Sequence, residues 1–234
     1  MSLFGGFRES SASGSHGPLA GWWAEEFTPE EQTTIAEQFT KYPPLGTTFN
    51  LRQLSTSPRF LINAATWFTR SDMARIRIRL LEKSLMELGR NPSPAELHYA
   101  YMGLMEAWHK LRDIDSAALQ TATDYCQRMI AIAPAAMEVL KRDGTWPEGT
   151  GLQHPGFNQL AVILDKQSRW PEAIEICRVA QRQGWAGDWT SQIDRYETKL
   201  AKSQATHRTS ASLVSLCPCG IPDSGQVASV PTAE

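Results

Sequence analysis

The chain has 234 residues and a formal net charge of −2; 41% of its residues are hydrophobic and 21% are charged. This charge disfavours a nucleic-acid partner, because phosphate binding requires a surplus of lysine and arginine on one surface. No run approaches the roughly 18 apolar residues of a membrane-spanning helix, and the N-terminus has no basic start or apolar core of a secretory signal. We therefore expect a cytoplasmic protein without a membrane partner.

The N-terminal part of the chain predicts a disordered leader followed by three helices. Residues 1–20 are rich in serine and glycine and lack an apolar period, which is typical of disorder. Thr28 and Glu31 form a capping box around a proline at the first helical position, and they predict a helix that ends near residue 39. Further helices are predicted over 57–68, after a Ser-Pro start, and over 72–89.

The middle of the chain predicts two long helices and a short one. Ser93 and Glu96 form a second capping box at the start of a helix with one apolar face. Asp115 caps the next helix, which we expect to end before Pro134, because proline disrupts a helix interior. A short helix over 135–142 follows.

The region 154–187 contains one nearly complete helix–turn–helix unit. Its first helix has four apolar residues at helical spacing, and its second helix has four more after a break at Ser168. These two sets are Phe157, Leu160, Ala161 and Leu164, then Trp170, Ala173, Cys177 and Ala180.

The order of small and large residues in this unit resembles a tetratricopeptide repeat. Leu160 and Ala173 are residues that the repeat prefers, whereas Trp185 stands where the repeat normally has proline. The resemblance implies an αα-superhelix whose groove binds a peptide or a partner helix. The segment 22–202 also resembles a group of bacterial proteins that end in this repeat, which implies no particular activity.

The chain as a whole is predicted to be all-α, because no alternating run of strand residues bounded by turns is present. Asp188 caps a last helix, so we expect about eight or nine helices in one domain over 21–202. Residues 203–234 are rich in serine, threonine and alanine and predict a disordered tail.

The repeat resemblance implies a partner-binding face on the first helix of the unit, with an aromatic rim beyond the second. The residues of this predicted site are Asn158, Gln159, Val162, Asp165, Lys166, Trp185 and Trp189. The alternative is that the helix face is simply solvated and that the two tryptophans hold the turn between them together.

No metal, cofactor or catalytic residue is predicted. His98, Met102, Met105 and His109 form one helical stripe of soft ligands suited to copper or haem. However, the two histidines stand about 16 Å apart along a helix, too far to share an ion. The carboxylates Glu30 and Glu31 lie in a first helical turn, where the helix dipole favours solvated anions.

The four cysteines do not predict a disulfide framework or a zinc site. Cys126 and Cys177 stand in apolar helical patterns, which predict buried thiols. Cys217 and Cys219 stand in the C-terminal tail. A zinc site needs about four ligands, and the tail adds only His207.

The leading functional hypothesis is a non-enzymatic protein-interaction module that binds a protein or peptide. One alternative is a self-assembling helical subunit that forms a homodimer. A second alternative is an enzyme whose pocket uses His98, His109 or the loop 146–154, which requires a histidine to converge with a carboxylate.

Overall fold

The computed structural model describes residues 21–41, 54–144 and 151–214, with side chains up to residue 206. Within these ranges the chain forms nine α-helices and a 3₁₀ helix but no strand, which confirms the all-α prediction. The elements are α1 (Trp22–Glu26), α2 (Pro29–Lys41), α3 (Pro58–Ala65), η2 (Ser71–Met73), α4 (Ala74–Glu87), α5 (Pro94–Lys110), α6 (Ala118–Arg142), α7 (Pro155–Lys166), α8 (Trp170–Arg182) and α9 (Trp189–Val214).

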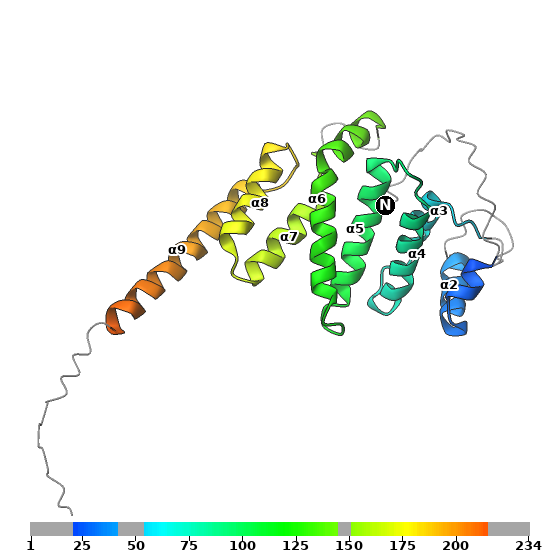
Figure 1. Ribbon diagram of the computed structural model, residues 1–234, viewed down its shortest axis with the longest axis horizontal. Coiled ribbons are helices and arrows are strands. Elements are labelled where there is room, and N and C mark those ends of the chain that lie inside the picture. The colour runs from blue at the N-terminus through cyan, green and yellow to red at the C-terminus, as the bar shows by residue number, and fades with distance from the viewer. Residues whose placement is uncertain (1–20, 42–53, 145–150, 215–234) are drawn as a thin grey trace, which may run out of the picture.

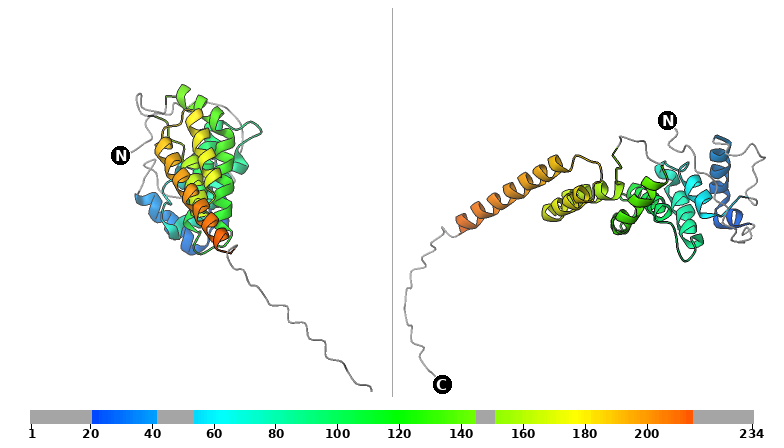
Figure 2. Two further views of the ribbon diagram at one scale, coloured as in Figure 1. Left: turned by 90° about the vertical axis from the view of Figure 1, so that its left-hand side faces the viewer. Right: turned by 90° about the horizontal axis from the view of Figure 1, so that it is seen from above.

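The helices follow one another across the molecule in chain order (Figure 1). From α3 to α9 each long helix packs against the next, and α3 also contacts α5, as α5 contacts α7. At one end of the row, α9 extends away from the other helices (Figure 2). No described helix combines the length and apolar character needed to cross a membrane.

Helix α6 contradicts the predicted break at Pro134. The helix continues through this proline to Arg142, so the two helices predicted from the sequence are one. Its buried side includes Met129, Ala133 and Ala136, which continue one apolar face past the proline, while Pro134 itself is exposed. Burial of that face against α5 and α7 outweighs the cost of about 3 kcal/mol that proline imposes on a helix interior.

Helix α9 continues beyond Lys202, where the fold was predicted to end, to Val214. The sequence has no glycine or proline between Asp188 and Cys217, so no residue in this stretch breaks the helix. The predicted leader at 1–20, residues 146–150 of the loop 146–154, and the tail cysteines Cys217 and Cys219 lie outside the described residues.

The buried side chains divide into two clusters. The N-terminal core comprises apolar residues of α1 to α5 and the start of α6, and the C-terminal core comprises those of α5 to α9. Helix α5 contributes to both cores. Leu104, and Leu111 directly after the helix, pack in the N-terminal core, whereas Met105 packs in the C-terminal core. This shared helix joins the two cores into one molecule.

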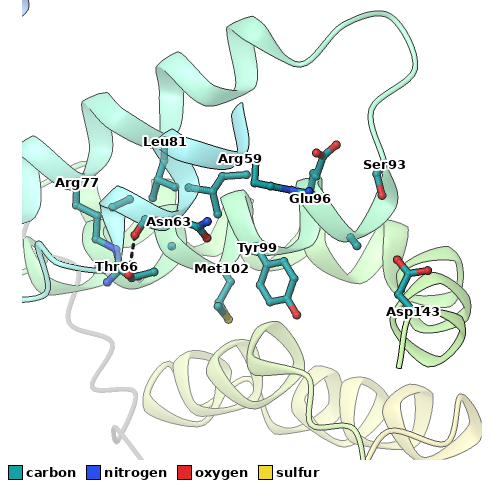
Figure 3. A pocket seen from close by; sticks show the side chains of 14 residues that line it. Arg59, Asn63, Thr66, Arg77, Leu81, Ser93, Glu96, Tyr99, Met102 and Asp143 are labelled. Atoms are coloured by element: carbon teal, nitrogen blue, oxygen red, sulfur yellow. Dashed lines mark hydrogen bonds between the residues drawn. The ribbon is translucent and has the colours of Figure 1, made fainter. Parts of the chain in front are cut away.

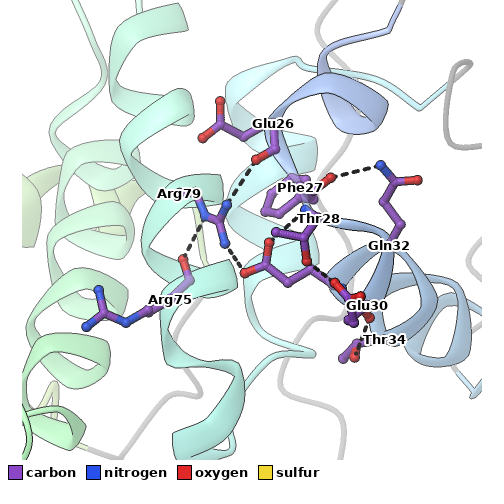
Figure 4. Close-up of polar contacts among 9 residues, drawn as sticks. Glu26, Phe27, Thr28, Glu30, Gln32, Thr34, Arg75 and Arg79 are labelled. Atoms are coloured by element: carbon purple, nitrogen blue, oxygen red, sulfur yellow. Dashed lines mark hydrogen bonds and ion pairs between the residues drawn. The ribbon is translucent and has the colours of Figure 1, made fainter.

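Polar contacts fasten α1 and α2 to α4 at the surface of the N-terminal core (Figure 4). The predicted capping box is formed: the Thr28 amide donates to Glu31 Oε2 at 3.0 Å, and the Glu31 amide donates to Thr28 Oγ1 at 3.3 Å. Arg79 of α4 donates to the other oxygen of Glu31 and to the Glu26 carbonyl, and its guanidinium lies 4.7 Å from the centre of the Phe27 ring. These contacts fix the α2 start against α4.

Candidate functional site

The predicted partner-binding face on α7 is only partly available. Asn158 and Gln159 are half-buried, whereas Val162 and Lys166 are exposed. Asp165 is engaged within the protein: both its oxygens accept from Lys199 Nζ at 2.7 Å, and Oδ1 also accepts from the Trp170 indole at 3.0 Å. Burial acts to raise the pKa of Asp165, but the hydrogen bonds from Lys199 and Trp170 lower it below its usual value. Asp165 therefore ties α7 to α8 and α9.

The two tryptophans assigned to an aromatic rim are core residues. Trp185 is 2% exposed and Trp189 is 3% exposed, and the Trp189 indole donates to the Trp185 carbonyl at 2.7 Å. Gly187 lies against this ring, because a Cβ at that position would stand 2.6 Å from Trp189 Cε2. These contacts match the alternative reading, in which the pair holds the α8–α9 turn, and neither indole is accessible to a partner.

A pocket that the sequence analysis did not predict lies between α3, α4 and α5 (Figure 3). Its volume is about 270 Å³. Helical spacing explains one wall: Arg59, Asn63 and Thr66 share one face of α3. Tyr99 and Met102 of α5 supply the apolar surface opposite. The faces of α3 and α5 thus form two walls of the pocket.

Gly103 permits the close approach of α4 and α5 beneath the pocket. A Cβ at this position would lie 2.6 Å from Leu81 Cδ1 and 3.4 Å from Arg77 Nη2. Any larger residue therefore pushes against the α4 side chains that line the pocket. A glycine in the interior of a helix is the feature of the sequence that marks this contact.

Arg77 supplies a buried positive group at the α4 end of the pocket. Its side chain is 7% exposed, and Nη2 pairs with Glu106 Oε2 at 2.7 Å. The Arg77 Nε atom is buried and has no hydrogen-bond partner. An unsatisfied N–H is costly to bury, and this atom has no accessible surface in the pocket, so a ligand there does not reach it. Arg77 shares the buried face of α4 with Leu81 and Ser84. A charged residue within this largely apolar face is a signal that the sequence analysis overlooked.

The opposite end of the pocket contains carboxylates (Figure 3). Ser93 and Glu96 were predicted to close a capping box, but the Ser93 side chain makes no cap hydrogen bond, and both side chains line the pocket instead. Asp143, which follows α6, joins them, and it also accepts from the neighbouring Arg142 at 3.2 Å. The capping box at α5 is therefore open, whereas the one at α2 is closed.

The predicted histidine–methionine stripe of α5 is divided between different surroundings. Met102 lines the pocket, Met105 and His98 are buried, and His109 lies beside Arg112. Burial and the charge of Arg112 lower the pKa of His109. Among the described residues, no group of three or more His, Cys, Asp or Glu is arranged to hold a metal ion.

His98 and His154 meet in the C-terminal core, with ring centres 5.1 Å apart and Trp185 beside both. Burial lowers the pKa of His98 to about 4 and, with the charge of His98, that of His154 to about 3. His154 Nδ1 accepts from the Phe157 amide at 3.2 Å and caps α7. The fully buried His154 is thus a packing and capping residue.

Cys126 and Cys177 are buried free thiols, as predicted. Burial raises the pKa of Cys126 to about 12 and that of Cys177 to about 11. Both groups therefore stay protonated at neutral pH, which makes them poor nucleophiles.

The chain was compared with family models, with curated proteins and with solved structures, and it matches none of them.

Proposed function

We propose that the protein is a non-enzymatic protein-interaction module whose pocket between α3, α4 and α5 receives a peptide segment of a protein partner. The observation that carries the proposal is a pocket whose apolar wall, with Tyr99 and Met102, adjoins polar side chains such as Asn63 and Glu96. Binding sites typically combine mostly apolar surface with a few polar groups that fix orientation. The pocket is slightly smaller than the range of about 300–1,000 Å³ that suits drug-sized ligands, so a few side chains of a peptide fit it better than a large cofactor.

The arrangement of helices is compatible with a tetratricopeptide-like αα-superhelix, which we include in the proposal. Each long helix contacts the next, and α5 also contacts α3 and α7, as expected of stacked helix pairs. Ala161 and Ala173, the small residues of the repeat resemblance, are fully buried in the C-terminal core. We place the module in the cytoplasm, without a cofactor or nucleic-acid partner.

The experiment is affinity capture from the native cell with the tagged full-length protein and two matched variants. Asn63→Trp fills the pocket from its exposed rim, and Val162→Trp makes a similar change on the exposed α7 face. We expect a partner that binds the wild type and the Val162→Trp variant but not the Asn63→Trp variant. Circular dichroism of each variant shows whether it retains its helical fold.

The other outcomes separate the competing hypotheses. If only the Val162→Trp variant loses the partner, the binding site lies on α7 and the pocket assignment is wrong. Recovery of the protein alone, together with a concentration-dependent dimer in analytical ultracentrifugation, favours the self-assembling subunit. If both variants still capture the partner, neither the pocket nor the α7 face is its binding site.

A further inference from the structure

The charged groups around the α3–α4–α5 pocket balance one another. Two guanidinium groups and two carboxylates line it: Arg59, Arg77, Glu96 and Asp143 (Figure 3). Arg77 is already paired with Glu106, and Asp143 is paired with the arginine before it in the chain. An ionic ligand is therefore attracted by one kind of group and repelled by the other, and it also loses its hydration. The pocket thus favours an uncharged ligand.

The wall between these groups is apolar and suits a flat ring. Ile62 and Ala65 of α3 and Leu81 of α4 contribute aliphatic surface, and Tyr99 and Met102 of α5 add a ring and a thioether. Tyr99 and Met102 are only half-buried, so part of their surface remains uncovered. Aromatic rings pack well against one another, and methionine sulfur makes favourable contacts with ring edges. An aromatic side chain therefore gains contacts here that an aliphatic one does not.

The volume of the pocket distinguishes between aromatic side chains. An apolar cavity of about 150 Å³ holds one benzene ring. The pocket has a volume of about 270 Å³, which leaves unfilled space around a single ring but accommodates the two fused rings of an indole. Because unfilled space forfeits dispersion contacts, tryptophan fits the pocket better than phenylalanine does.

Polar groups of the pocket match the remaining needs of a tryptophan residue. The indole N–H requires an acceptor when it is buried. Ser93 and Glu96 line the pocket at the start of α5, and the Ser93 hydroxyl is not used as a helix cap. Glu96 precedes Tyr99 by about one helical turn, so its carboxylate can reach the edge of a ring that lies over Tyr99. On α3, the exposed Asn63 amide offers a donor and an acceptor for the neighbouring peptide groups.

We infer that the pocket takes one tryptophan side chain of the partner segment as its anchor. This inference rests on the proposed function and names the chemistry of its partner. The indole lies against Tyr99 and Met102, its N–H donates to a side-chain oxygen of Ser93 or Glu96, and the peptide groups beside it contact Asn63.

The test uses capped tripeptides and nuclear magnetic resonance titration of the full-length protein at millimolar peptide concentration. The central residue of Gly-X-Gly is tryptophan, 1-methyltryptophan, phenylalanine, leucine or lysine. We expect the tryptophan peptide to shift the amide signals of Met102 and Gly103, and affinity to fall from tryptophan through phenylalanine and leucine to lysine. The 1-methyl group removes the indole N–H and should weaken binding about three- to tenfold, the net value of one hydrogen bond.

Protein variants locate the binding site and the acceptor. Asn63→Trp fills the pocket and should abolish the shifts, whereas Val162→Trp on α7 should retain them. The double variant Ser93→Ala/Glu96→Ala removes both acceptors but leaves the apolar wall unchanged. It should bind the tryptophan peptide as weakly as the 1-methyl version, and its affinity for the 1-methyl version should equal that of the wild type.

Several results overturn the inference. These are equal binding of the tryptophan and leucine peptides, tighter binding of the lysine peptide, shifts that persist in Asn63→Trp, or no shifts with any peptide. If a native partner is nevertheless lost in Asn63→Trp, the proposed function stands and only the tryptophan anchor fails. If no peptide binds and the pocket variant still captures the partner, both proposals fail.

Discussion

The two cores of the molecule use ring side chains differently. The N-terminal core packs indole and phenyl rings against one another, with Trp23 in contact with Phe27, Phe39 and Phe60. The C-terminal core places two imidazoles, His98 and His154, among its aromatic rings. Phenyl rings are indifferent to pH, whereas a buried imidazole must remain neutral.

This difference predicts that the two halves respond differently to the same disturbance. The charged groups of the N-terminal half are held in ion pairs: the half-buried Arg79 pairs with Glu31, and the buried Arg77 pairs with Glu106. The C-terminal half instead buries groups that can acquire a charge, and its stability depends on their staying neutral. Helix α5, which both cores share, determines how far a disturbance in one spreads to the other.

The largest effect should come from removing a fully buried ring in each half. Phe68→Ala and Phe157→Ala each delete a side chain that is 0% exposed, and each should lower the free energy of unfolding by about 3–5 kcal/mol. Hydrogen exchange should show lost protection mainly in α3 and α4 for the first and in α7 to α9 for the second. Equal loss throughout the chain in both variants would show that the cores unfold as one unit.

Acidification should weaken the C-terminal half next most strongly. The folded-state pKa values of His98 and His154, about 4 and about 3, lie below 6.5, the value for an unperturbed histidine. The unfolded state therefore binds protons first. The stabilisation is complete above pH 6.5 and falls by about 1.4 kcal/mol per histidine for each pH unit below it.

Urea unfolding at pH 7, 6 and 5 measures this dependence. His98→Phe and His154→Asn each remove one titrating ring, and asparagine at position 154 keeps an N-cap acceptor for α7. Each variant should have a smaller loss of stability between pH 7 and pH 5 than the wild type. An identical loss in all three proteins would assign the pH dependence to other groups.

Overpacking of the C-terminal helix pair should have an intermediate effect. Ala173 is fully buried at the contact of α7 and α8, so Ala173→Trp should lower the free energy of unfolding by about 1–3 kcal/mol or more. Glu175→Trp, at an exposed position of the same helix, is the matched control and should change stability little. Thermal unfolding of the two variants measures the difference, and equal melting temperatures would refute the helix-pair packing.

Local signals in the sequence predict where helices start. Features that depend on tertiary contacts, such as the course of α6 and the burial of Trp185, could not be predicted in this way. Pro29, Pro58 and Pro94 begin helices because proline fits the first turn whatever surrounds it. Pro134 predicts the end of a helix, but the buried face of α6 overrides this local signal. Whether Trp185 is a rim or a core residue depends on the segment before α7, which packs His154 against it.

The candidate pocket was missed for the same reason. Arg59, Arg77 and Glu96 are far apart in the sequence, and only the approach of α3 to α5 brings them to one cavity. The Ser93–Glu96 pattern is a valid capping box by its residues. Nothing in the local sequence indicates that its side chains line a pocket instead.

The smallest predicted effect compares the two capping boxes directly. Thr28→Ala removes an acceptor that the Glu31 amide uses, so it should cost about 1 kcal/mol, whereas Ser93→Ala removes a side chain that makes no cap hydrogen bond and should change stability by less than about 0.5 kcal/mol. In a chain of this size, about 1 kcal/mol corresponds to a shift of about 2–4 °C in melting temperature, which calorimetry resolves. Equal shifts would mean that Ser93 caps α5 in solution. The side chains of Ser93 and Glu96 would then be engaged in the cap and would not be available to line the pocket.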